Sequence, residues 1–146
     1  MMSLQNLVGV SLDSITPSRE TVARLRAAAK RQIADALVAS ISAETRFAAA
    51  YTAIRMLADL ALHANGYRTL TSRPGHHQTA IQTLTLSVGL APQTVQVLDA
   101  LRKQRHLTEY SGELIPESAV VECVAQAKAL QIEIAQWLKA HKPKRL

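Results

Sequence analysis

The chain has 146 residues, of which 48% are hydrophobic and five are aromatic, and it carries 17 basic against 11 acidic side chains. A domain of this size can fold without a disulfide or a structural metal, and the apolar content argues against disorder. Twenty-four alanines with so few aromatic residues exclude a β-sandwich or barrel and favour closely packed helices. The net charge of +6 suits a polyanionic partner, although many basic proteins have none.

Cysteine content and hydropathy limit the kinds of metal site, disulfide and cellular location that the chain can have. Cys123 is the only cysteine, which excludes an internal disulfide and zinc sites built on paired cysteines. The first fifteen residues have no basic region of the kind that opens a signal peptide. The most apolar stretch, 47–62, contains two charged residues and is too short to span a membrane. We therefore expect a cytoplasmic protein without membrane contact.

Apolar residues at helical spacing predict five helices with short connections. The expected ranges are about 17–39, 43–64, 77–88, 92–110 and 117–140. Thr16 and Pro17 open the first helix, Ser40 or Ser42 caps the second, and Gly66 follows its end. Segment 66–76 has no period and is expected to be irregular. The prediction is an all-α, up-down antiparallel bundle over 16–140, with an N-terminal extension 1–15 and a basic tail 141–146.

Each predicted helix has an apolar stripe that we expect to face the core. The stripe residues are Val22, Leu25, Ala29, Ile33 and Leu37; Phe47, Tyr51 or Ala50, Ile54, Leu57 or Ala58 and Ala61; Ile81, Leu84 and Val88; Val95, Leu98 and Leu101; and Val120, Val124, Ala127, Leu130, Ile134 and Leu138.

The fourth helix carries the most informative polar residues. Arg105 lies seven residues after Leu98, nearly two full turns, and so continues the inward stripe, and Arg102 lies on the same side. His106 and Tyr110 are four apart and share a face. An arginine on the packed side of a helix needs a carboxylate, a carbonyl or a ligand phosphate as partner.

Two interpretations of this cluster stay open. In the structural one, Arg102 and Arg105 pair with acidic residues inside the bundle, for which the candidates are Asp59, Asp99 and Glu109. In the functional one, the arginines contact a phosphate group, a histidine moves protons near neutral pH, and a tyrosine offers a hydroxyl and a stacking face.

A second cluster precedes the third helix. Arg68, Arg73, Gly75, His76 and His77 lie just before a helix N-terminus, where backbone N–H groups favour an anion. An ordinary loop with solvated arginines is the simpler interpretation. If the loop folds over the Arg105 end of the bundle, both clusters form one basic groove. Adjacent histidines point in different directions on a helix, so we expect no metal site and no cofactor.

The run Arg105, His106 and Tyr110, placed before the last helix, resembles the signature of the HEPN superfamily, and the stretch 64–84 resembles a segment of its bacterial members. The resemblance implies a small helical bundle that forms a homodimer and acts on RNA. It further implies a metal-independent endoribonuclease of a toxin–antitoxin pair, with Arg105 contacting phosphate and His106 beside it. Tyr110 occupies the position of the family's histidine.

Two functions therefore stay open. The first is RNA or nucleotide-phosphate binding through Arg105, His106 and Tyr110, supported by Arg102, with or without cleavage. The second is a non-catalytic helical module that docks an acidic partner protein, such as a nucleotidyltransferase-type antitoxin. A helix-turn-helix DNA binder is disfavoured, because the arginines of the fourth helix point toward the core.

Overall fold

The computed structural model describes residues 2–145. Its helices are α1 (Arg19–Ala36), α2 (Ala43–Ala64), α3 (His76–Gln82), α4 (Leu84–Val88), α5 (Pro92–Ser111) and α6 (Glu117–His141). Two short strands, β1 (Leu12–Ser14) and β2 (Tyr67–Thr69), and two 3-10 turns, η1 (Leu4–Leu7) and η2 (Pro143–Arg145), complete the described part.

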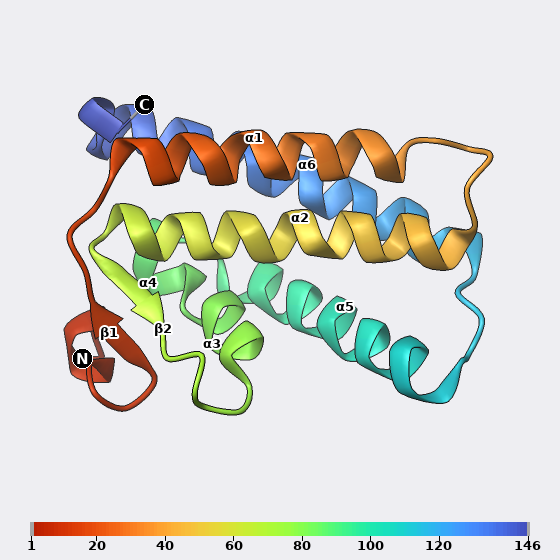
Figure 1. Cartoon of the computed structure of the whole chain (residues 1–146), viewed down its shortest axis with the longest axis horizontal. Coiled ribbons are helices and arrows are strands. Elements are labelled where there is room, and N and C mark those ends of the chain that lie inside the picture. Colours follow the sequence, from red (N-terminus) through yellow and green to blue (C-terminus); the bar gives the residue numbers. More distant parts are fainter. Residues whose placement is uncertain (1, 146) are drawn as a thin grey trace.

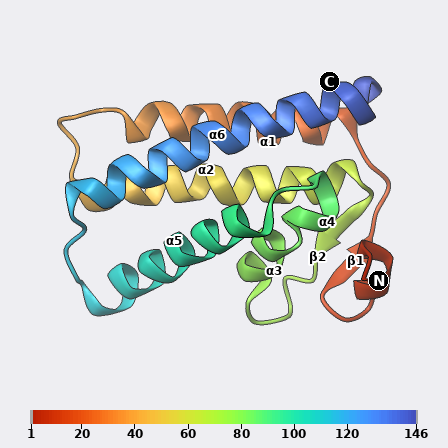
Figure 2. The ribbon, with the colours of Figure 1, turned by 180° about the vertical axis from the view of Figure 1, so that it is seen from behind.

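Helix α2 is the centre of the molecule. Helices α1 and α6 run along one side of it, and α3, α4 and α5 lie on the other (Figures 1 and 2). Of its 22 residues, 12 are buried, and many of these are alanines that let neighbouring helices approach closely. Successive long helices run in opposite directions, so the predicted all-α, up-down bundle is confirmed.

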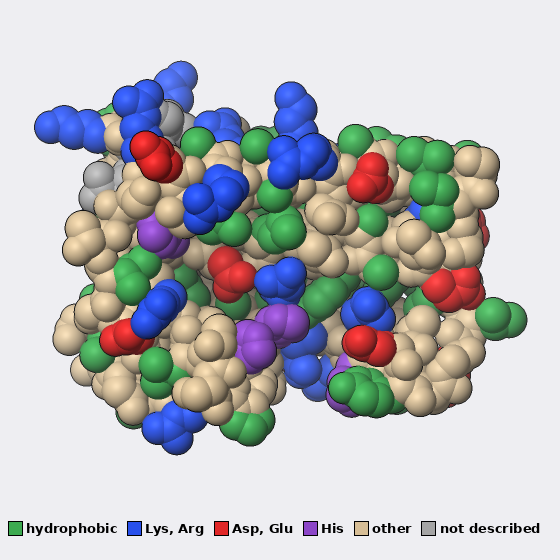
Figure 3. Space-filling model, viewed as in Figure 1, with side chains coloured by type: hydrophobic (Ala, Val, Ile, Leu, Met, Phe, Trp, Pro, Cys, Tyr) green, Lys and Arg blue, Asp and Glu red, His purple; other side chains and the backbone are tan. Residues whose placement is uncertain are grey.

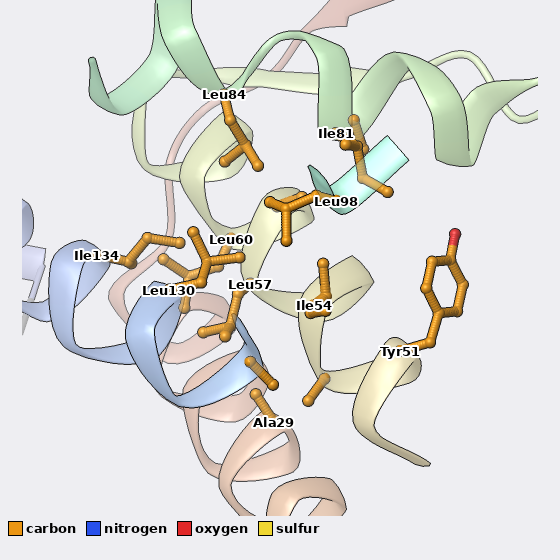
Figure 4. Close-up of a cluster of buried hydrophobic side chains, with 14 of the residues drawn as sticks. Ala29, Tyr51, Ile54, Leu57, Leu60, Ile81, Leu84, Leu98, Leu130 and Ile134 are labelled. Carbon is orange, nitrogen blue, oxygen red and sulfur yellow. The ribbon is translucent and has the colours of Figure 1, made fainter. Parts of the chain in front are cut away.

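The predicted stripes form the core (Figure 4). Leu57, Ile81, Leu98 and Ile134 come from four different helices and are at most 2% exposed. Leu25 and Val95 are partly buried against the same cluster. The prediction is wrong for Leu37, which is 50% exposed, because α1 ends at Ala36 and the chain turns away there.

Helix starts follow serine caps. The Ser18 side chain accepts a hydrogen bond from the Thr21 amide, so α1 begins two residues later than the predicted Pro17 start. Ser42 caps α2 in the same way through the Thr45 amide, as expected.

The predicted third helix, 77–88, is broken into α3 and α4. The break is at Thr83, whose hydroxyl donates to the carbonyl oxygens of Thr79 and Ala80 at 2.9 and 3.1 Å. A threonine bonded back to its own helix bends it, and here α3 ends at Gln82 and α4 begins at Leu84.

The strand pair was not predicted. β1 pairs antiparallel with β2, with Leu12 opposite Thr69 and Ser14 opposite Tyr67. Gly66, at φ +90°, turns the chain from α2 into β2 in a conformation that other residues rarely adopt. Leu12 is fully buried, so the described part of the expected extension 1–15 packs onto the bundle, and Met1 lies outside the described residues. Part of the segment 66–76, which was expected to be irregular, is the strand β2.

The C-terminal end is more ordered than a free tail. His141 closes α6 and its ring stacks on Trp137, with ring centres 5.0 Å apart. The turn η2 then contacts α1 and α6. Leu146, the last residue of the predicted tail, lies outside the described residues. Between residues 2 and 145, every helix is too short or too polar to cross a lipid bilayer.

Candidate functional site

A cleft of about 450 Å³ lies between α3 and α5, with α2 at its base. It collects the polar side chains of three helices: Tyr51, Thr52 and Arg55 from α2, His76, His77 and Gln78 from α3 with Gly75 before it, and Arg102, Arg105, His106 and Glu109 from α5. In Figure 3, histidine and basic side chains gather around a hollow in the lower half of the molecule.

Helix α2 contributes a tyrosine and an arginine one turn apart. Tyr51 and Arg55 share a face because they are four residues apart. Nη1 of Arg55 lies 3.5 Å from Oδ2 of Asp59, a further turn along the helix. Burial raises the pKa of the Asp59 carboxyl, while the charges of Arg55 and His76 lower it. Asp59 thus holds Arg55 from outside the cleft lining.

Helix α5 contributes Arg102 and Arg105, whose side chains are 20% and 29% exposed. Nε of Arg102 donates to Oδ1 of Asp99 at 2.8 Å, and Nη1 of Arg105 lies 3.5 Å from Oε2 of Glu109. The predicted pairing of these arginines is therefore found with two of the three candidate acids. Both acids lie on α5 itself, and Glu109 is 57% exposed, so its pair with Arg105 lies at the surface and not inside the bundle. Asp59 pairs with Arg55 instead.

Each of these ion pairs engages one guanidinium nitrogen, and a guanidinium has three. Arg102 uses Nε, which leaves both of its Nη groups outside the pair, and Arg105 keeps Nε and Nη2. Each carboxylate holds its arginine through one guanidinium nitrogen. The N–H groups on the other two nitrogens lie outside the ion pair and can donate to a ligand. The two sequence interpretations are thus compatible in the structure.

Helix α3 places two histidines opposite the arginines. Gly75 precedes the helix at φ +77°, and the His76 and His77 rings meet edge to face with centres 4.4 Å apart. Burial, followed by the charge of Arg55, lowers the pKa of His77 to about 4. His77 is therefore neutral at pH 7, when it can donate or accept a hydrogen bond without adding charge.

The Tyr51 hydroxyl is the unusual group of this site. Tyr51 is 6% exposed, and its oxygen is buried without a hydrogen-bond partner in the described part of the chain. Burial raises its pKa to about 12, although the charges of Arg102, Arg55 and Arg105 oppose this. Its ring lies at the edge of the apolar cluster in Figure 4. A buried hydroxyl that remains protonated is a donor without an acceptor.

Five of the eight predicted site residues line the cleft: Arg102, Arg105, His106, His76 and His77. The second predicted cluster thus reaches the cleft through Gly75, His76 and His77, of which both histidines lie on α3. Arg68 instead pairs with Asp13 at 3.1 Å on the strand pair, and Arg73 is exposed outside the lining.

The prediction that Tyr110 joins Arg105 and His106 in one polar cluster is only partly right. The Tyr110 ring contacts that of His106, with centres 4.5 Å apart, as their shared helix face requires. However, Tyr110 is 76% exposed and does not line the cleft. It lies one turn beyond His106, near the C-terminal end of α5.

Sequence reasoning missed Tyr51, Arg55 and their neighbour Thr52. Tyr51 fits the apolar stripe of its helix, so its hydroxyl drew no attention. Arg55 carried a signal, since a charged residue one turn after a stripe tyrosine in the most apolar helix needs a partner. Arg55 meets Arg102 and Arg105 in the cleft only because α2 packs beside α5. Residue spacing within one helix cannot predict that packing.

Other chemistry-bearing residues lie apart from the cleft. Cys123 is fully buried in the core, and burial raises the pKa of its thiol to about 12, which suits a small hydrophobic residue. Among residues 2–145, His, Cys, Asp and Glu side chains form no group of three that could hold a metal ion.

Comparison of the chain with protein-family models, with curated proteins and with solved structures gives no significant match. The resemblance to the HEPN superfamily therefore remains a prediction from the motif.

Proposed function

We propose that the cleft between α2, α3 and α5 binds a phosphate group of RNA or of a nucleotide. The observation that carries this proposal is the convergence of Arg55, Arg102 and Arg105 from two helices on one cleft. Arginine is suited to phosphate because its planar fork donates two parallel hydrogen bonds to phosphate oxygens.

The surroundings support an anionic ligand. His77 and His106 add N–H donors from opposite sides of the cleft. Each arginine is held by a carboxylate four or fewer residues away, so little side-chain entropy is lost when a ligand binds. The net charge of +6 favours the approach of a polyanion at low salt.

Cleavage of RNA without a metal is the catalytic form of the same proposal. A ribose 2′-hydroxyl would attack the adjacent phosphorus and break the bond from phosphorus to the 5′-oxygen of the next nucleotide, which leaves a 2′,3′-cyclic phosphate and a 5′-hydroxyl. Arginines would stabilise the charge on the phosphoryl oxygens, and an imidazole would take the proton of the 2′-hydroxyl and pass it to the leaving 5′-oxygen. His106 is the imidazole beside Arg105. Tyr110 is not placed to carry this proton, because its side chain lies outside the cleft.

Filter binding of a single-stranded RNA to Arg105→Ala tests the binding proposal. Loss of one charge-assisted contact costs about 1.5–3 kcal/mol, so affinity should fall roughly tenfold to a hundredfold. Lys103→Ala is the matched control, since it removes the same charge from the same helix at a side chain that is 68% exposed. Equal affinities for wild type and Arg105→Ala would end the proposal.

The same proteins, incubated with RNA in EDTA, test cleavage. We expect any cleavage to disappear in Arg105→Ala and in His106→Ala and to persist in Tyr110→Phe. Cleavage that depends on Tyr110 would contradict the assignment of the proton carrier.

One observation favours a second function, docking of a partner protein. Leu107, Tyr110 and Leu114 are 53%, 76% and 84% exposed near the C-terminal end of α5. Exposed apolar side chains grouped beside a charged cleft are typical of protein interfaces. Capture of an acidic protein that Leu114→Asp abolishes, together with no affinity for RNA, would favour this function over phosphate binding.

A further inference from the structure

The proposed phosphate cleft has a donor that an ordinary RNA backbone does not need. Tyr51 lines the cleft with 6% of the residue exposed, and its hydroxyl oxygen is buried without a partner among residues 2–145. Leaving a buried hydroxyl unsatisfied is costly, so its position calls for an explanation. The charges that act on it are those of Arg102, Arg55 and Arg105 and of the carboxylate of Asp59.

The number of free donors on the lining favours a phosphate with three acceptor oxygens. Three guanidinium groups line the cleft and each is paired with one carboxylate, so their formal charges balance while most of their N–H donors stay outside these pairs. A phosphate within a nucleic-acid backbone carries a single negative charge. A phosphate monoester carries about −1.5 to −2 at pH 7 and presents three acceptor oxygens.

The arrangement of donors leads to the same ligand. A backbone phosphodiester has two unesterified oxygens and must continue as a chain on both sides. A terminal phosphate has one ester link and can point its three other oxygens into a closed end. Arg55, Arg102, Arg105 and the Tyr51 hydroxyl supply donors from two helices around such an end.

We propose that the cleft recognises a terminal phosphate monoester of RNA or of a nucleotide, with the Tyr51 hydroxyl at its base donating to a phosphoryl oxygen beneath the arginines. This inference rests on the proposed function and narrows its ligand. Tyr51 is a binding residue here, because it contacts the phosphate itself.

Fluorescence anisotropy with three forms of one short labelled oligoribonucleotide tests the proposal. One form ends in a 5′-phosphate, one in a 3′-phosphate and one in hydroxyl groups at both ends. We expect at least one phosphorylated form to bind about tenfold or more tightly than the hydroxyl form, as one charge-assisted contact allows. Inorganic phosphate should compete with the preferred form.

Two variants show whether Tyr51 causes the preference. Tyr51→Phe removes only an unpartnered hydroxyl, so the protein should fold and the preference should fall to about threefold or less. Tyr67→Phe is the matched control: it makes the same change on the strand pair, outside the cleft lining, at a hydroxyl that donates to Oε1 of Gln5 at 3.0 Å. We expect its preference to equal that of wild type.

The outcomes separate this inference from the proposed function. Equal binding of all three oligonucleotides, with binding lost in Arg105→Ala, would overturn the terminal-phosphate inference and leave phosphate binding intact. A preference that survives in Tyr51→Phe would also overturn it. If no form binds to wild type, both proposals fail.

Discussion

Two open regions of this molecule lie on opposite sides of α2. They are similar in size and differ in whether their basic side chains are held by ion pairs. The groove between α1 and α6 has a volume of about 500 Å³ and the cleft between α3 and α5 about 450 Å³. Both have basic side chains on their walls, Arg26 and Lys30 in the groove and three arginines in the cleft.

The difference lies in how those charges are held. Arg26 and Lys30 come from one exposed face of α1 beside apolar residues such as Ile132, and no ion pair within residues 2–145 fixes either of them. The cleft arginines come from two helices, are held by carboxylates, and surround a buried hydroxyl. Positive charge is common to both regions, and preorganisation belongs to the cleft alone.

The largest expected effect contrasts two double variants of equal charge. Arg55→Ala with Arg102→Ala should lower RNA affinity by roughly a hundredfold or more, because two charge-assisted contacts are lost. Arg26→Ala with Lys30→Ala removes the same charge from the groove and should lower affinity by about threefold or less at physiological salt, where solvated charges are screened. Filter binding measures both, and similar losses in the two variants would remove the distinction between the regions.

Tyr51→Phe should affect stability and binding in opposite directions. Removing a buried hydroxyl without a partner should raise the free energy of unfolding by about 1 kcal/mol. Urea denaturation measures this change, with Thr52→Val as a control that loses a hydrogen-bonded hydroxyl and should not gain stability. A destabilised Tyr51→Phe would show that the hydroxyl already has an acceptor in the free protein.

The pH dependence of stability provides a smaller test, at His77. Its pKa falls from 6.5 to about 4 on folding, so the unfolded chain takes up a proton first as the pH falls. His77 therefore contributes nothing above about pH 6.5, and its contribution reduces stability progressively between about pH 6.5 and 4.

Urea denaturation of wild type and His77→Asn across this range checks the sign. Between pH 7 and 4.5 the free energy of unfolding should fall less in the variant than in wild type. The effect of Asp59 on the pH dependence is present in both proteins and cancels in the comparison. A steeper loss in His77→Asn would mean that the folded protein stabilises the charged imidazole.

The smallest effects are expected for Arg68→Ala and Arg73→Ala. Arg68 pairs with Asp13 on the strand pair, at a side chain that is 66% exposed, and such surface pairs contribute about 0–1 kcal/mol. Each variant should change RNA affinity by less than about threefold, since solvated charges act only through the general field. A tenfold loss in filter binding would extend the site across the strand pair and weaken the contrast between cleft and surface.

Periodicity within each helix was enough to predict most of the fold. The stripes from Val22 to Leu138 became the core because a 3.6-residue repeat determines which side of a helix is apolar. The break at Thr83 depends on a local hydroxyl bond that competes with the helix. The pairing of β1 with β2 joins residues more than fifty positions apart in segments of three residues, too short for a pattern to show.

The site was predictable to the extent that its residues lie on one helix or on one loop. Arg102, Arg105 and His106 follow from the spacing on α5, and His76 and His77 from their position at the start of α3. Tyr51 and Arg55 belong to a helix whose other residues indicate only core. Their role depends on the packing of α2 against α5, which is a property of the tertiary fold.

Phosphate binding in the cleft is tested by a ¹H–¹⁵N NMR titration of the whole chain with a short 5′-phosphorylated oligoribonucleotide. We expect the largest amide shift changes on the cleft helices, at Arg55, His77 and Arg105, and no change in the groove around Arg26 and Ile132. Shift changes concentrated on α1 and α6, or none at saturating ligand, would contradict phosphate binding in the cleft.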